Sequence, residues 1–142
     1  MTARSQSPQL LVVEDDPAIC ELVRECLEAE GYAVVTADGM EQAVAVLTQR
    51  QFDLVLSDVI GEATPVPAVD RWRNLDRLRY LAGGTPTIIF TAHGGYDFAA
   101  FREHGFSDLL LKPFDLDDLV AVVQRNLAQH TQTRNGKRGT RN

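Results

Sequence analysis

Six side chains able to bind a cation or a phosphoryl group follow short apolar runs that have the composition of buried β-strands. They lie just beyond the runs 10–13, 54–57, 87–90 and 108–111: Glu14, Asp15, Asp16, Asp58, Thr91 and Lys112. Three adjacent carboxylates repel one another, which costs free energy unless a cation binds or an acid caps a helix. Carboxylate, backbone carbonyl and water oxygens are the ligands that Mg²⁺ or Mn²⁺ prefers. The set predicts a divalent-cation site, provided that the fold brings these residues together.

A carboxylate in such a site can attack phosphorus and become an aspartyl phosphate. Phosphoryl transfer requires mainly positioning and charge stabilisation, which the metal, Lys112 and Thr91 would supply. Asp58 is the predicted nucleophile because it stands alone after its strand, whereas Asp15 and Asp16 are placed to hold the metal. Lys112 is the strongest single signal, because the only other lysine of the chain lies near the C-terminus. The ammonium group of a lysine acts as a point charge for a phosphoryl oxygen or a carboxylate.

Four of these residues also have a purely structural interpretation. Asp16 precedes Pro17 and could simply cap a helix, and Asp58 could be an ordinary loop acid. Thr91 could be a β-branched residue that ends a strand, and Lys112 could belong to a turn. The joint pattern favours a site, because four separate strands would each end in a suitable group.

Five predicted strands alternate with five predicted helices. The strands are expected at 10–13, 33–36, 54–57, 87–90 and 108–111. The helices are expected at 17–30, from a capping box at 38–41 onward, at 69–81, at 96–104 and after a cap at Asp115. This alternation predicts an α/β, doubly wound, flavodoxin-like (βα)5 fold with parallel strand order 2-1-3-4-5. Ligands bind beyond the carboxyl ends of strands 1 and 3 in such sheets, where the six polar residues would meet.

Other features exclude several classes of protein. No Gly-x-Gly-x-x-Gly follows the first strand, which disfavours a dinucleotide-binding fold. Cys20 and Cys26 are expected on one helix, about 9 Å apart along its axis, which is too far for a disulfide, so we interpret both as core residues. The three histidines are scattered and suggest no zinc site: His93, His104 and His130.

The length of 142 residues suits one domain, and the net charge of −6 argues against a nucleic-acid footprint. We expect an N-terminal tail at 1–7, a domain at 8–130 and a basic, disordered tail at 131–142, which could instead serve as a contact arm. No apolar run approaches the ~20 residues that span a bilayer, and no signal peptide is evident, so a cytoplasmic location is expected.

Four motifs together resemble the receiver domain of two-component response regulators. They occur in order and at suitable spacing over residues 8–130: Val13-Glu-Asp-Asp-Pro17, Asp53-Leu-Val-Leu-Ser-Asp58, Phe90-Thr-Ala92 and Leu111-Lys-Pro-Phe114. The resemblance implies that Asp58 accepts a phosphoryl group from a histidine kinase or a phosphotransfer protein. It also implies that Thr91 and Lys112 contact that group.

The same resemblance implies a set of metal ligands and a cis peptide bond. Asp15 and Asp16 would bind Mg²⁺, aided by Asp58 and by the backbone carbonyl of Ile60. Receivers usually have a cis bond between the lysine and the proline, so Lys112-Pro113 is expected to be cis.

The sequence departs from the usual receiver pattern at two places. Gly61-Glu62 replaces the common Met-Pro, so the loop 59–68 is unusual. Leu109 stands where receivers carry the aromatic switch residue that couples to Thr91. We therefore expect the larger response to phosphorylation in the loop 93–95 and the helix 96–104.

The resemblance also bears on partners. The segment 131–142 is too short for a DNA-binding fold, so we expect no direct DNA binding, and we expect no membrane contact. The protein is expected to act as a single-domain regulator, as a phosphorelay intermediate or as a receiver separated from its partner module. Its downstream protein target is not specified by the sequence. Receivers commonly dimerise through the fourth helix, the fifth strand and the last helix, which makes a homodimer possible here.

Two alternatives from other classes remain. One is a phosphorylation-independent interaction module with the same fold. The other is a phosphohydrolase with an aspartate nucleophile, which usually needs a second acid two residues later as the general acid/base. Ile60 occupies that position, which disfavours the hydrolase.

Overall fold

The computed structural model describes residues 7–59, 68–91 and 98–140 of the chain. Strands and helices alternate as the sequence predicts. The strands are β1 (Gln9–Val13), β2 (Ala33–Ala37), β3 (Leu54–Asp58), β4 (Thr87–Thr91) and β5 (Asp108–Leu111). The helices are α1 (Pro17–Ala29), α2 (Met40–Leu47), α3 (Ala68–Ala82), α4 (Phe98–Glu103) and α5 (Leu116–Thr140).

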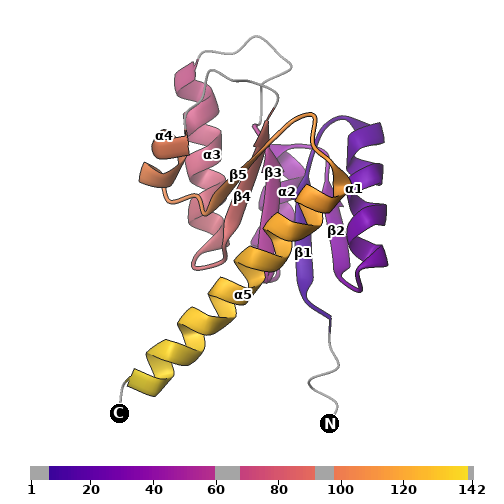
Figure 1. Ribbon diagram of the computed structural model, residues 1–142. Coiled ribbons are helices and arrows are strands. Elements are labelled where there is room, and N and C mark those ends of the chain that lie inside the picture. The colour runs from indigo at the N-terminus through magenta and orange to yellow at the C-terminus, as the bar shows by residue number, and fades with distance from the viewer. Residues whose placement is uncertain (1–6, 60–67, 92–97, 141–142) are drawn as a thin grey trace.

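The five strands form one parallel sheet in the order β2-β1-β3-β4-β5 (Figure 1). The predicted doubly wound fold and strand order are therefore confirmed. β1 and β3 are neighbours in the sheet, although β2 lies between them in sequence. Their carboxyl ends meet at the switch point, where the predicted site residues lie.

Helices cover both faces of the sheet. One core cluster joins β1, β3 and β4 to α1 and α5, and it contains Leu56, Phe90 and Leu119. Two clusters on the other face join the sheet to α2, α3 and α4. Cys20 and Cys26 pack against the first cluster as free thiols, as predicted.

The ends of the first two helices show how local sequence sets the element boundaries. Asp16 caps α1, and Gly31 follows its C-cap with a φ of 96°, a backbone conformation that glycine adopts without steric cost. The predicted capping box at 38–41 is wrong by one residue, because it would make Asp38 the N-cap of α2 (Met40–Leu47). Gly39 is the N-cap of α2, and the side chain of Gln42 accepts a hydrogen bond from the backbone N–H of Asp38 at 2.8 Å.

Helix α5 differs from the expectation at its C-terminus. Its backbone continues to Thr140, into the segment 131–142 that was predicted to be disordered, and it projects past the sheet (Figure 1). Adding a residue to an existing helix is easier than nucleating one, so the packed first turns of α5 favour this extension. Within the described residues, no helix combines the length and the apolar composition needed to cross a membrane.

Asp108, the first residue of β5, ties this strand to α5. Its carboxylate accepts hydrogen bonds from Asn126 Nδ2 at 2.9 Å and from Arg125 Nη2 at 2.7 Å, and its other oxygen accepts one from Leu109 N at 2.9 Å. Burial alone would raise the pKa of Asp108, but these hydrogen bonds outweigh burial and lower it. The ionised carboxylate therefore stabilises the strand whose C-terminal end leads to Lys112.

Aromatic and ionic contacts join α3 to α4. The indole of Trp72 stacks on His104, with ring centroids 3.9 Å apart, and it also contacts the ring of Phe101 at 5.2 Å. His104 Nδ1 lies 2.7 Å from a carboxylate oxygen of Asp76. Leu109 packs against the same aromatic cluster as a partly buried side chain. The apolar side chain at 109 is therefore part of the packing between the sheet and these two helices.

Candidate functional site

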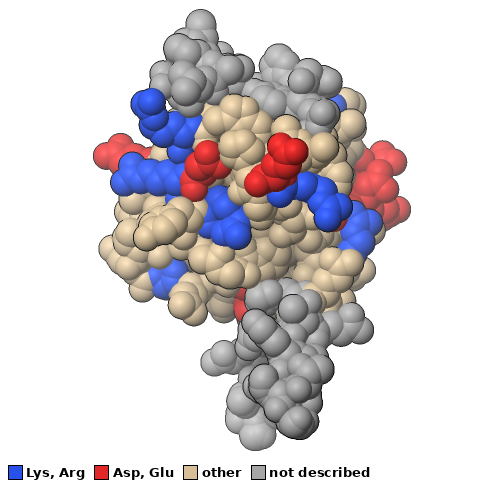
Figure 2. Space-filling view, turned by 90° about the vertical axis from the view of Figure 1, so that its left-hand side faces the viewer, with Lys and Arg blue, Asp and Glu red and all other residues tan. Residues whose placement is uncertain are grey.

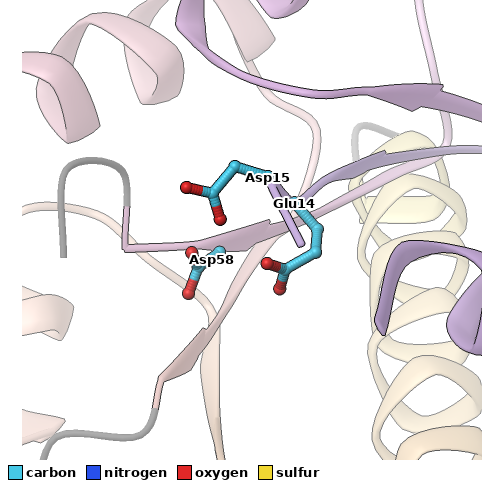
Figure 3. A group of neighbouring side chains, drawn as sticks. All are labelled: Glu14, Asp15 and Asp58. Carbon is cyan, nitrogen blue, oxygen red and sulfur yellow. The ribbon is translucent and has the colours of Figure 1, made fainter. Parts of the chain in front are cut away.

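Three carboxylates meet where β1 and β3 end. Glu14 and Asp15 follow β1, Asp58 is the last residue of β3, and their ligand atoms all lie within 4.8 Å of one another. Figure 3 shows the carboxylates of Glu14 and Asp15 directed toward Asp58 from the neighbouring strand end. These carboxylates are close together because β1 and β3 pair in parallel and in register from Leu10 and Leu54 onward.

Lys112 completes the cluster from the end of β5. Its Nζ donates hydrogen bonds to Glu14 Oε1 at 2.9 Å and to Asp58 Oδ1 at 3.1 Å. Its backbone N–H donates to the carbonyl of Thr91 at 2.8 Å, which fixes the ends of β4 and β5 side by side. The bond Lys112-Pro113 is cis, as predicted. The fold thus brings Asp58, Thr91 and Lys112 to one edge of the sheet.

Burial sets the electrostatics of this cluster. The side chain of Glu14 is 1% exposed and that of Lys112 is 15% exposed. Burial raises the pKa of the Glu14 carboxyl, although hydrogen bonds from Asp16 N–H and Lys112 oppose it. Burial alone would lower the pKa of Lys112, but Glu14 and Asp58 outweigh it and raise that pKa. Lys112 is therefore an ammonium ion at neutral pH.

The structure places Asp16 differently from the predicted metal ligand. Its Oδ1 accepts hydrogen bonds from Ala18 N at 2.9 Å and from Ile19 N at 3.3 Å, so Asp16 caps helix α1. Among the described residues, the set of three acids that could hold a metal contains Glu14 instead of Asp16. Asp15 is a member of the group, as predicted.

A period-two argument would have identified Glu14. Val12 and Leu56 are paired residues of β1 and β3, and both belong to the core cluster on the α1–α5 face. Side chains two residues further along each strand point to the same face. That rule places Glu14 and Asp58 together, whereas counting acids after the apolar run does not distinguish Glu14 from Asp16.

Several predicted features lie outside the described residues. They are the backbone carbonyl of Ile60, most of the loop 59–68 and the loop 93–95. Thr91 is fully buried at the end of β4, and Leu109 lies in β5, so both predicted switch positions are placed by the sheet.

Comparison with known proteins identifies the family. A model of the response regulator receiver domain matches residues 10–124. The chain belongs to the response regulator receiver domain family. This receiver domain is 35% identical over 121 residues to the transcriptional regulatory protein GlrR of Escherichia coli K12, covering 84% of this chain and 26% of GlrR. It is 35% identical over 122 residues to the transcriptional regulatory protein TcrA of Mycobacterium tuberculosis, covering 85% of this chain and 46% of TcrA. The receiver domain thus spans less than half the length of either relative.

Solved structures agree with this fold. The receiver domain of NtrX from Brucella abortus is 28% identical with a TM-score of 0.72, over 84% of this chain and 98% of that one. A longer NtrX structure from the same organism is 26% identical with a TM-score of 0.81, over 93% of this chain and 29% of that one. The receiver domain protein from Methanospirillum hungatei JF-1 shares the fold with a TM-score of 0.77 at 24% identity, over 90% of this chain and 99% of that one.

Proposed function

We propose that this receiver domain is a phosphoacceptor switch, which receives a phosphoryl group on Asp58 and then changes its interactions with partner proteins. The donor would be a histidine kinase or a phosphotransfer protein, and the reaction would depend on Mg²⁺. One observation carries the proposal: the buried Asp58 carboxylate stands at the end of the central strand, hydrogen-bonded to the Lys112 ammonium and next to two further acids. Membership of the receiver family supports it.

The proposed reaction is a simple displacement. A carboxylate oxygen of Asp58 forms a bond to phosphorus while the bond from phosphorus to the donor breaks, and the donor leaves with that electron pair. The positive charge of Lys112 would stabilise the oxygens of the transferring group. The hydroxyl of Thr91 would bind the phosphoryl group once it is on Asp58. The protein's own catalysis would be limited to its phosphorylation and dephosphorylation.

The three grouped carboxylates fit a hard divalent cation. Oxygen-only ligation is what Mg²⁺ or Mn²⁺ prefers, and Glu14, Asp15 and Asp58 supply three carboxylate oxygens. When bound, the cation would neutralise negative charge on the phosphoryl oxygens. The exposed Asp15 would give it access from solvent, while Glu14 and Asp58 would hold it at the strand ends.

The proposal assigns the metal to Asp15 rather than to Asp16, because Asp15 belongs to the group of three acids. Millimolar Mg²⁺ should raise the melting temperature of the wild-type protein, because it binds the native state preferentially. Asp15→Asn should abolish most of that increase. Asp16→Asn should retain it, because asparagine caps a helix about as well as aspartate. Loss of the increase in Asp16→Asn, with retention in Asp15→Asn, would contradict the assignment.

Partner binding is proposed for the face formed by α4, β5 and α5. Leu111 of β5 and Leu116 of α5 are large apolar side chains that are 53% and 41% exposed, which suits a protein contact or a homodimer. On the face that carries α3 and α4, acidic and basic side chains lie interspersed (Figure 2). That mixture favours a protein partner over direct DNA binding. A cytoplasmic location, where a kinase domain could reach Asp58, is proposed with it.

Incorporation of phosphate tests the proposed function. With Mg²⁺ and acetyl phosphate, intact-mass measurement should show one phosphoryl adduct on the wild-type protein and none on Asp58→Asn. Asp53→Asn is the matched control. Asp53 directly precedes β3, at the end of the strand opposite to Asp58, where its carboxylate accepts a hydrogen bond from Gln9 N at 2.7 Å. An equal adduct on Asp58→Asn, or no adduct on the wild-type protein, would refute the proposal.

A further inference from the structure

The ring of Phe90 lies beneath the ammonium group of Lys112. Lys112 Nζ is 4.9 Å from the ring centroid, within the distance of a cation–π interaction. Phe90 is also the residue of β4 that pairs with Asp58 of β3. Its side chain is fully buried, so the ammonium group meets the ring in a largely desolvated place.

The ring is itself held in place. Phe114 packs against it edge to face, with centroids 6.1 Å apart and an interplanar angle of 80°. Phe90 belongs to the core cluster between the sheet and α1 and α5, and Phe114 packs against that cluster. A side chain fixed in this way can act as a rigid support.

The ammonium group of Lys112 contacts Glu14, Asp58 and Phe90, and the proposed reaction affects each of them differently. Asp58 would change from a carboxylate to an acyl phosphate, and Glu14 would exchange the lysine for a metal ion. Phe90 keeps the same charge distribution throughout. A lysine side chain has much rotamer freedom to lose, so a constant contact reduces the cost of holding its ammonium group in one position.

We propose that Phe90 is a positioning residue, which holds the Lys112 ammonium group beside Asp58 for phosphoryl transfer. The contact acts through the electrostatics of the ring face as well as through packing. This inference rests on the proposed function of Asp58. It goes beyond that function by assigning a role to a core aromatic residue that contacts Lys112 and is not one of the residues proposed to bind the phosphoryl group or the metal.

Two measurements test the inference. In the metal-free protein, the ring current of Phe90 should shift the ε-CH2 proton resonances of Lys112 upfield, and Phe90→Leu should abolish that shift. With saturating Mg²⁺ and acetyl phosphate, Phe90→Leu should slow phosphorylation about fivefold to thirtyfold, as expected for loss of a desolvated cation–π contact. Replacing Phe90 by 3,4,5-trifluorophenylalanine, which largely keeps the shape but weakens the negative ring face, should also slow it.

Phe52→Leu is the matched control. Phe52 is 5% exposed and has the Arg50 guanidinium over its ring at 4.8 Å. It precedes the N-terminal end of β3, at the end of the strands opposite to Lys112. This variant should lose core packing while it keeps the Lys112 resonances and a phosphorylation rate within about twofold of wild type, because the contact beneath Lys112 is intact.

The outcomes separate the two proposals. An unchanged Lys112 resonance in Phe90→Leu, or a wild-type rate in the trifluorinated protein, would overturn the inference and leave phosphorylation of Asp58 standing. Failure of the wild-type protein to become phosphorylated would overturn the proposed function and, with it, the positioning role.

Discussion

Replacing Lys112 by methionine should destabilise the metal-free protein strongly. Methionine keeps the length and much of the volume of the lysine stem, but it removes the hydrogen bonds of 2.9 and 3.1 Å to Glu14 and Asp58. Two buried carboxylates then face each other without a counter-charge. Breaking a buried ion pair by removing one partner costs about 3 to 5 kcal/mol, and we expect the lower end of that range for Lys112→Met.

The lower value follows from the state of Glu14. At 2.9 Å and an effective dielectric constant of about 20, the gross attraction is roughly 6 kcal/mol, and desolvation of both ions cancels a large part of it. Burial also raises the pKa of Glu14 above its ordinary value of 4.5. The raised pKa contributes stability below pH 4.5 that is lost as pH rises through the folded pKa. The cost of Lys112→Met should therefore be smaller in acid than at neutral pH, because Glu14 can take up a proton.

A double-mutant cycle isolates the pair. Urea denaturation in EDTA would compare the wild-type protein with Glu14→Gln, Lys112→Met and the double variant, and we expect a coupling free energy of about 2 kcal/mol. The control cycle uses Arg24→Met and Glu28→Gln, whose ion pair lies on the surface of α1 and should show no resolvable coupling. A site coupling no larger than that of the control would refute the electrostatic description of the site.

Three further predictions concern the surrounding fold. The lowered pKa of Asp108 contributes stability above pH 3.8 that is lost as pH falls through the folded pKa. Asp108→Asn should therefore cost about 2 kcal/mol of unfolding free energy at neutral pH and almost nothing in strong acid. An equal cost in strong acid would contradict this. Gly105→Ala should cost about 2 kcal/mol by urea denaturation, because φ is +95° and a Cβ there would lie 2.9 Å from an α3 guanidinium nitrogen. Gly83→Ala, at φ +64° with nothing within 4 Å, should cost less, so an equal cost would rule out the clash. Beryllofluoride with Mg²⁺ should change the fluorescence of Trp72, the chain's only tryptophan, because its indole stacks on His104 of α4; unchanged emission, with altered amide exchange confined to 59–68, would exclude a response of α4.

Periodic patterns predicted the fold because they report burial directly. The apolar runs of β1, β3 and β4 are covered on both faces of a parallel sheet, which is why each reads as an unbroken apolar segment. Boundaries were less predictable where two residues could cap the same helix. Asp38 and Gly39 compete in this way before α2, and the structure uses the glycine.

The sequence predicts where the site lies in the fold, but it does not predict which side chains contact one another there. Strand order alone brings Asp15, Asp58 and Lys112 to one edge of the sheet. The choice between Glu14 and Asp16 depends on which side chain turns inward after β1, and this is set by the pairing of β1 with β3. The contact of Lys112 with Phe90 depends on side-chain packing between β4 and the chain after β5, on which residue spacing gives no information.

The most direct test of the central claim is to locate the phosphoryl group chemically. An acyl phosphate is reduced by borohydride to an alcohol, so a phosphorylated aspartate becomes homoserine and can be found by tandem mass spectrometry of peptides. After treatment with acetyl phosphate and Mg²⁺, we predict homoserine at position 58 in the wild-type protein, and none at position 58 when EDTA replaces Mg²⁺. Homoserine at Asp15, Asp16 or Asp53 with an unmodified Asp58 would contradict the account.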